Sequence, residues 1–177
     1  SPVSPANANV SSPKQIPATY GDEWDLSKTN GNGAASTGAI KTDGTLWVWG
    51  KNQYGNLGQG NRTDSQDPIQ VGTDNNWASL AMGGTSSVAI KTNGTLWTWG
   101  INTYGQLGQN QGPGGGSNSR SSPTQVGTDT DWSTSSTALA AGYNSAIAVL
   151  KNDGTLWTMG YNNQGKLGDD TSTNRSS

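Results

Sequence analysis

The sequence contains neither cysteine nor histidine, and it carries few charges for its length. Without these residues there are no disulfides, no metal site built on thiolates or imidazoles, and no nucleophile that relies on a histidine base. The net charge is -2, and only ten of the 177 residues are Lys or Arg. They give no basic stripe for phosphates, so we expect no nucleic-acid binding. No apolar run is long enough to span a bilayer.

Glycine and tryptophan are abundant instead, with 26 Gly and eight Trp residues. A hydrophobic content of 29% can indicate disorder, but disordered chains usually combine it with high net charge and few aromatic residues. A weakly charged chain rich in Gly, Asn, Ser and Thr, with Trp at regular intervals, is typical of many short strands joined by tight turns. We therefore expect an all-β fold.

One seven-residue pattern occurs three times, at offsets of 50 and 60 residues. It reads Gly-Thr-Leu-Trp-x-Trp-Gly at 44–50 and 94–100, and Met159 replaces its last Trp at 154–160. An earlier Trp and a Pro-x-Gln-Val/Ile segment accompany each copy: Trp24, Trp77 and Trp132, and residues 13–16, 68–71 and 123–126. These landmarks divide the chain into a Pro/Ser/Asn-rich linker and three repeat units, which are 1–12, 13–67, 68–122 and 123–177.

Each copy predicts a β-hairpin followed by a strand that is buried on both faces. The turn dipeptides Asp43-Gly44, Asn93-Gly94 and Asp153-Gly154 are those preferred in two-residue type I′ turns, where both residues take positive φ. In the strand that follows the first turn, Leu46 and Val48 alternate with two Trp residues. A strand that is apolar on both sides is typical of a propeller blade sandwiched between two neighbours.

The combination of an Asp/Asn-Gly turn, the Gly-Thr-Leu-Trp-x-Trp-Gly pattern and a Pro-x-Gln segment resembles the RCC1 (regulator of chromosome condensation) repeat, from about Pro13 to the end of the chain. The resemblance implies a β-propeller with four-stranded blades, of which about three are visible here as a partial propeller. Family members often have His at the positions of Ser36, Ser86 and Ser145, so this chain is more similar to divergent bacterial and viral members.

Three blades cannot close a ring, and an open end exposes strand edges and apolar faces. We expect further blades either from the same longer polypeptide or from association of copies. The last residues, 174–177, are expected to lie at a blade boundary.

Two motifs suggest catalysis or phosphate binding but fall short of it. Residues 160–166 nearly spell a phosphate-binding loop, but Leu167 replaces the required Ser or Thr. Glycoside hydrolysis needs two converging carboxylates, and Glu23, beside Asp22 and Asp25, is the only Glu. We expect no enzyme activity, no cofactor and no metal. A calcium role for Asp129, Asp131 or the pair Asp169-Asp170 is the weaker alternative to ordinary turn chemistry.

Loops that differ between repeats are the expected place for function. The loop 109–122 is longer than its counterpart 59–67, and Tyr and Arg are the residue types that anchor protein interfaces. The candidate contacts lie in or beside these turns: Tyr54, Arg62, Tyr104, Gln109, Pro113 and Arg120. The alternative is that the two Tyr residues pack over their own turns as part of the repeat.

We therefore expect a non-catalytic interaction or structural module, belonging to a larger surface-displayed, secreted or phage virion fibre protein. Its expected partner is a protein or a surface glycan, at an extracellular or virion surface. The resemblance also implies two alternatives, a secreted protein-binding inhibitor similar to the RCC1-like β-lactamase inhibitors and a guanine nucleotide exchange factor. The sequence pI of 4.8 disfavours the latter. A glycan-binding adhesin is a further alternative.

Overall fold

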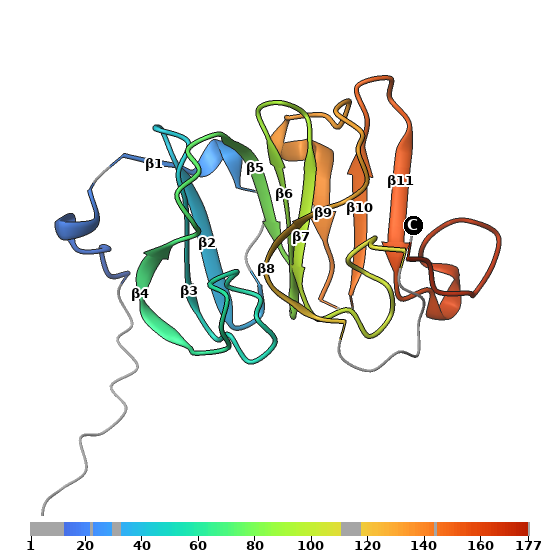
Figure 1. Ribbon diagram of the computed structural model, residues 1–177, viewed down its shortest axis with the longest axis horizontal. Helices are drawn as coiled ribbons and strands as arrows, with labels where there is room; N and C mark the ends of the chain where they lie inside the picture. The colour runs from blue at the N-terminus through green and yellow to red at the C-terminus, as the bar shows by residue number, and fades with distance from the viewer. Residues whose placement is uncertain (1–12, 22, 30–32, 111–117, 144, 177) are drawn as a thin grey trace, which may run out of the picture.

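Three antiparallel sheets follow one another along the chain in the computed structural model (Figure 1), which describes residues 13–21, 23–29, 33–110, 118–143 and 145–176. The first sheet has the order β1 (Trp24–Asp25), β2 (Ser36–Lys41), β3 (Leu46–Gly50), β4 (Ser65–Gln70). The second has the order β5 (Trp77–Met82), β6 (Ser86–Lys91), β7 (Leu96–Gly100), β8 (Arg120–Gln125). The third contains β9 (Leu139–Ala141), β10 (Ala146–Leu150) and β11 (Leu156–Gly160).

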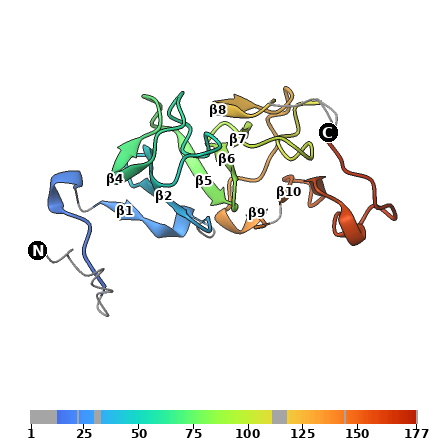
Figure 2. The same cartoon turned by 90° about the horizontal axis from the view of Figure 1, so that it is seen from below.

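The sheets stand side by side as successive blades (Figure 2), so the predicted all-β, partial propeller is confirmed. Within the described residues, four short 3-10 turns interrupt the loops: η1 (Ala18–Tyr20), η2 (Leu26–Lys28), η3 (Ser136–Ala138) and η4 (Asn163–Gly165). In the described part of the chain no helix has both the length and the apolar character needed to cross a membrane.

The blades are offset from the sequence units, because β4 and β8 each span a unit boundary. A bridge pairs Gly160 with Arg175, as Gly50 pairs with Ser65 and Gly100 with Arg120 in the first two sheets. Arg175 therefore lies where the outer strand of the third blade begins. The prediction that the last residues mark a blade boundary is wrong.

The β2–β3 hairpin and its two counterparts have three-residue loops rather than type I′ turns. Gly44 N donates to Lys41 O over 2.9 Å, Lys41 N donates to Thr45 O over 2.9 Å, and Gly44 has φ +83°. The Asp43 carboxylate accepts from the backbone N and Oγ1 of Thr45, at 2.9 and 2.7 Å. Asp43, Asn93 and Asp153 are not among the described residues with positive φ. The type I′ prediction is wrong because the side chain bonds forward along the loop, and only the Gly adopts the left-handed conformation.

The core lies between neighbouring blades rather than within one sheet. Leu46 and Val48 pack against Trp77 and Trp99 of the second blade. One blade further, Leu96 packs with a cluster of apolar residues that includes Trp132 and Met159. Burial on both faces is therefore confirmed for β7, where Leu96 and Trp99 are fully buried.

The third blade departs from the predicted burial. Leu156 and Trp157 of β11 are 64% and 51% exposed, whereas Leu96, the counterpart of Leu156, is fully buried, and Trp97, the counterpart of Trp157, is partly buried. The reason is geometric: a blade buries its Leu side only where the next blade covers it.

Backbone hydrogen bonds join the blades in the same way at each junction. Trp77 N donates to Gly44 O over 3.1 Å, and Trp132 N donates to Gly94 O over 3.2 Å. Gly60 N donates to Ser121 O over 2.7 Å, so the β3–β4 loop of the first blade is anchored to the outer strand of the second. This anchoring fixes the loops at the ends of the strands, where the candidate site lies.

Candidate functional site

The carboxylates considered for a metal are paired with cationic side chains. Asp129 and Asp131 both contact Lys151 Nζ, at 2.7 and 3.1 Å. Lys151 Nζ also lies 5.0 Å from the ring centre of Trp132, so this pairing belongs to a Lys–Trp cluster that recurs in the blades. Asp74 makes the equivalent contact with Lys91 at 2.8 Å. The recurrence of Asp before Trp thus coincides with ion pairing to the lysine of this cluster.

Within the described ranges, no three Asp or Glu side chains gather as a group able to hold a metal ion. Glu23 accepts a hydrogen bond from Thr42 Oγ1 over 3.3 Å. In the loop that resembles a phosphate-binding motif, Lys166 Nζ lies 4.5 Å from the ring centre of Tyr161, and this contact accounts for its position.

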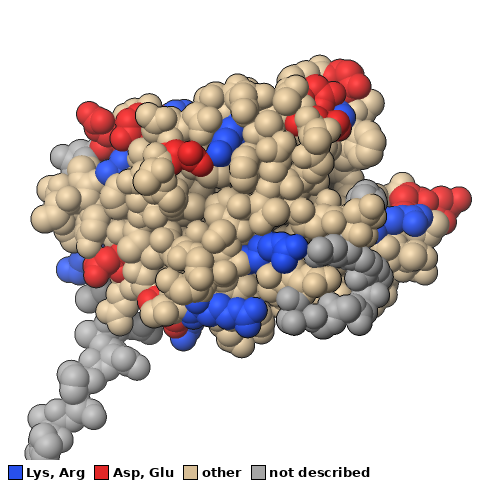
Figure 3. All heavy atoms as spheres, viewed as in Figure 1, with Lys and Arg blue, Asp and Glu red and all other residues tan. Residues whose placement is uncertain are grey.

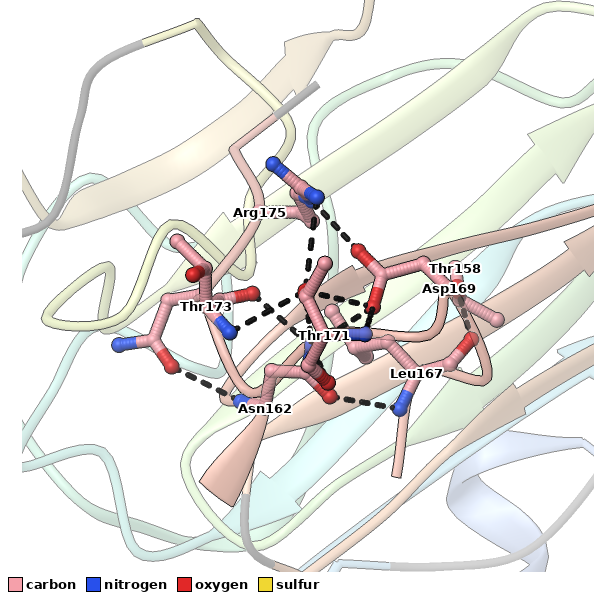
Figure 4. Close-up of polar contacts among 8 residues, drawn as sticks. Thr158, Asn162, Leu167, Asp169, Thr171, Thr173 and Arg175 are labelled. Carbon is pink, nitrogen blue, oxygen red and sulfur yellow. Dashed lines mark hydrogen bonds and ion pairs between the residues drawn. The ribbon is translucent and has the colours of Figure 1, made fainter. Parts of the chain in front are cut away.

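A buried asparagine organises the turn that follows each third strand, as Figure 4 shows for Asn162. Asn162 Oδ1 accepts from Leu167 N over 2.9 Å, and Asn162 Nδ2 donates to Thr173 O over 2.9 Å. Asn52 and Asn102 hold Leu57 N and Leu107 N in the same way. These fully or nearly buried amides replace the backbone partners that the turns lack, so the turns are rigid supports for the side chains they carry.

The third turn is also held by an ion pair between Asp169 and Arg175 (Figure 4). Arg175 Nε donates to Asp169 Oδ2 over 2.6 Å, and Asn162 Nδ2 donates to Asp169 Oδ1 over 2.9 Å. The bond from Arg175, with a further bond from Thr171, holds the pKa of the Asp169 carboxyl far below its usual range. The loop is therefore stabilised by the ionised form of Asp169.

This ion pair predicts an acid-sensitive loop. A depressed pKa contributes stability that is fully present above the unfolded-state pKa of about 4 and is lost progressively as the pH falls from there toward the pKa of the folded state. We expect the melting temperature advantage of the wild type over Asp169→Asn to be present at pH 7 and to shrink toward about pH 3. Thermal melts of both proteins over this pH range measure it. Asp170→Asn is the matched control, and a pH-independent difference for Asp169→Asn would contradict the prediction.

Tyrosines from all three blades surround a depression of about 470 Å³ at the end of the sheets where β3, β7 and β11 finish. Tyr54 and Tyr104 come from the turns after β3 and β7, Tyr143 from the β9–β10 loop, and Tyr161 follows β11. The rest of the wall is small or weakly polar, formed by residues such as Ala34, Ala35, Gly84, Thr85 and Ile101. The depression is therefore an aromatic, uncharged hollow.

Neighbouring groups fix two of these rings. Tyr104 and Tyr161 lie with their ring centres 4.3 Å apart and their planes at 37°. Asn163 Nδ2 donates to the hydroxyl of Tyr161 over 3.0 Å. Tyr143 is 73% exposed, and its ring lies against Gly84, where an added Cβ would come 3.2 Å from Tyr143 Cδ2. The site combines a rigid aromatic pair with a projecting ring.

The structure brings together only part of the predicted contact set. Tyr54 and Tyr104 line the depression, whereas Arg62, Gln109 and Arg120 do not. Pro113 lies outside the described residues.

Each of the three residues outside the depression has a clear place in the fold. Gln109 Nε2 donates to Gln125 O over 3.1 Å, as Gln59 Nε2 does to Gln70 O over 2.9 Å, so Gln109 ties its turn to β8. Arg62 is exposed in the loop before β4. Arg120 begins β8, and its carbonyl oxygen would lie 3.3 Å from a Cβ added at Gly55. Contact with a partner through these residues stays a prediction.

Sequence reasoning missed Tyr143 and Tyr161. Tyr161 occupies the repeat position of Lys51 and Ile101, while Gln164 stands where the other turns have Tyr. The third repeat thus supplies its ring from a different position, and Tyr161 reaches Tyr104 of the preceding blade. The available signal was a Tyr in the third repeat where the first two have Lys51 and Ile101. It indicates a site only once the turns of neighbouring blades are known to meet.

Antiparallel blades, two of them four-stranded and one described with three strands, pack in series through cores that contain Trp and define the chain as part of a β-propeller. The family model for the regulator of chromosome condensation (RCC1) repeat matches residues 43–90 and 93–149, and a second model of this repeat matches 77–106. The chain belongs to the RCC1 repeat family. A search of curated proteins returned no match.

Solved structures of similar fold come from human and yeast proteins. Human WBSCR16 is 24% identical, over 80% of this chain and 36% of that one, with a TM-score of 0.63. Yeast RCC1 (Prp20) bound to Kap60 is 19% identical, over 82% and 34%, with a TM-score of 0.66. Prp20p from Saccharomyces cerevisiae, described with its binding to Gsp1p and histones, is 18% identical, over 82% and 36%, with a TM-score of 0.67. The present chain spans about a third of the length of these proteins.

Proposed function

We propose that the chain is a non-catalytic protein-interaction module that binds a protein partner in the tyrosine-lined depression. The observation that carries the proposal is the convergence of four of the five tyrosines of the chain, from three different blades, on one hollow. Tyr presents a large apolar ring with a hydrogen-bonding tip, and it is enriched at the centres of protein interfaces. A volume of about 470 Å³ is suited to a few side chains of a partner segment.

The charge distribution supports recognition by tyrosine rings and hydroxyls rather than by a strong electrostatic field. Figure 3 shows a mainly uncharged surface on which Lys, Arg, Asp and Glu are scattered in small groups. The described walls of the depression contain no charged side chain. The yeast RCC1 structures are described with proteins as partners, which favours a protein over other ligands. We further propose that the module is displayed by a larger secreted, surface or virion protein.

Glycan binding is the second candidate function. Two rings at 4.3 Å, with Tyr143 projecting beside them, offer faces on which a sugar ring could stack. A glycan would need the hydroxyls and backbone groups of the same depression. Both functions therefore predict sensitivity to the same tyrosines, and they differ in the ligand.

Tyr104→Ala is expected to weaken partner binding about tenfold or more, because it removes one ring of the Tyr104–Tyr161 pair that lines the depression. Tyr143→Ala is expected to act in the same direction and, since its ring is 73% exposed, to leave the fold intact. The measurement is capture of partners on the immobilised chain, followed by titration of each captured protein. Asn152→Ala, exposed at the β10–β11 hairpin and outside the depression, is the control.

A glycan array probed with the same proteins separates the two functions. Titratable protein partners that Tyr104→Ala and Tyr143→Ala both lose support the proposal. Sugar binding without a protein partner would replace it with the glycan function. Binding that neither variant alters would place the site elsewhere on the chain.

A further inference from the structure

The third blade presents an uncovered face that repeats the buried faces of the first two. Leu156 is 64% exposed at the position where Leu46 and Leu96 are fully buried. Each of those two is covered by Trp residues of the following blade, Trp77 and Trp99 in one case and Trp132 in the other. The Leu156 face thus has the chemistry of a blade junction without its second half.

The hairpin glycines also indicate that the third blade is uncovered on this side. A Cβ added at Gly44 or Gly94 would overlap the carbonyl oxygen of Asn75 or Thr130, in the segment that enters the next blade. At Gly154, the equivalent residue of the third blade, no atom lies within 4 Å of an added Cβ. All three have φ between +76° and +86°. The third hairpin therefore has the conformation that lets another backbone approach closely, with no described residue in that place.

The opposite end of the chain carries the matching half. Trp24 and Trp49 of the first blade occupy the positions of Trp77 and Trp99, which cover Leu46 and Val48. Together with Ile16 and Leu26 they line an open groove of about 360 Å³, and Leu26 is 70% exposed. The chain thus exposes a Trp face at one end and a Leu face at the other.

Residues 13–16 at one end of the chain and the outer edge of β11 at the other each lack the strand partner that the other could supply. Residues 68–71 and 123–126 contribute to β4 and β8 and their ends, with Gln70 opposite Trp47 and Gln125 opposite Trp97. Residues 13–16 have the same Pro-x-Gln-apolar pattern, but in this structure they belong to no strand. In the third blade, the described pairing on the outer side of β11 is the single bridge from Gly160 to Arg175.

We propose that copies of this chain associate head to tail, with residues 13–16 of one copy pairing with β11 of another. The register of the two complete blades places Gln15 opposite Trp157. The Trp24–Trp49 face then covers Leu156, as Trp77 and Trp99 cover Leu46. The junction repeats the relation between neighbouring blades. Its apolar faces are covered, its backbone groups are hydrogen-bonded, and the Gly154 hairpin receives a neighbouring backbone. Such a heterologous contact closes a ring if the rotation permits, and otherwise extends into an open chain.

Sedimentation of the 177-residue chain from about 1 to about 100 µM tests self-association, with dimers or larger species expected as the concentration rises. Leu156→Asp is expected to weaken association about tenfold or more, because it places a charge in the apolar junction. Leu156 is mostly exposed within one copy, so this variant keeps the fold. Tyr143→Asp, at an equally exposed ring away from the junction, is the control.

A disulfide test checks the geometry directly, since the chain has no cysteine of its own. Copies carrying Gln15→Cys are mixed with copies carrying Trp157→Cys under mild oxidation. Directly opposed positions in antiparallel strands are close enough for a disulfide, so a covalent heterodimer is expected. Gln15→Cys mixed with Tyr143→Cys is the control. A monomer at every concentration, which would leave the face to a further repeat or another protein, overturns the proposal. So does crosslinking no stronger than the control.

Discussion

Replacing Trp99 by alanine is expected to lower the free energy of unfolding by about 3–5 kcal/mol. Trp99 is fully buried on β7, at the junction between the first and second blades. Its ring lies 6.2 Å from that of Trp77, and its Nε1 donates to Asn56 O over 2.8 Å. The change removes a large apolar ring and also a hydrogen bond that anchors the turn of the preceding blade. Urea denaturation followed by circular dichroism measures the loss.

Trp49→Ala is the matched control, because Trp49 occupies the same repeat position in the first blade. Its ring is only partly buried, in contact with Trp24 at 6.0 Å and facing the open groove. We expect a loss of about 1–2 kcal/mol at protein concentrations that keep the chain monomeric, since less apolar area leaves water on folding. Equal losses for the two variants would contradict a core located between blades.

The fold could be predicted from the sequence because its determinants repeat. The Trp, Gly and Pro-x-Gln positions recur in register. At the junctions between described blades they have the same structural meaning: a strand buried by the next blade, a hairpin approached by a neighbouring backbone, or an outer strand. The turn type could not be predicted from the dipeptide alone. Asp-Gly also suits a three-residue loop, and the choice is made by Thr45, which donates both its N and its Oγ1 to Asp43.

The candidate site was only partly accessible to sequence reasoning. Tyr54 and Tyr104 stood out because they lie in turns at equivalent positions, but Tyr161 and Tyr143 reach the same hollow from positions that the repeat does not relate. Gln109 looked like part of a variable loop, although its amide is bonded to β8. Which side chains meet at a propeller end depends on the spacing of the blades, and a single repeat does not contain that information.

The hairpin glycines provide the second large expected effect. In Gly94→Ala the new methyl group would overlap the carbonyl oxygen of Thr130, and it would also disturb the bond from Trp132 N to Gly94 O at 3.2 Å. A non-glycine residue in the left-handed region costs about 1–2 kcal/mol, and a disturbed backbone bond adds about 1 kcal/mol or more. We therefore expect Gly94→Ala to lower the free energy of unfolding by about 3 kcal/mol or more, measured by urea denaturation.

Gly154→Ala separates the two contributions, because Gly154 has nearly the same backbone conformation as Gly94, with φ of +86° against +76°. With no atom within 4 Å of the added Cβ, it is expected to show only the conformational cost of about 1–2 kcal/mol in a monomeric chain. The excess in Gly94→Ala then measures the close approach between neighbouring blades. If the two variants lost equal stability, the hairpin glycines would be required for their turns alone, and the close packing of one blade hairpin on the next would carry no energetic weight.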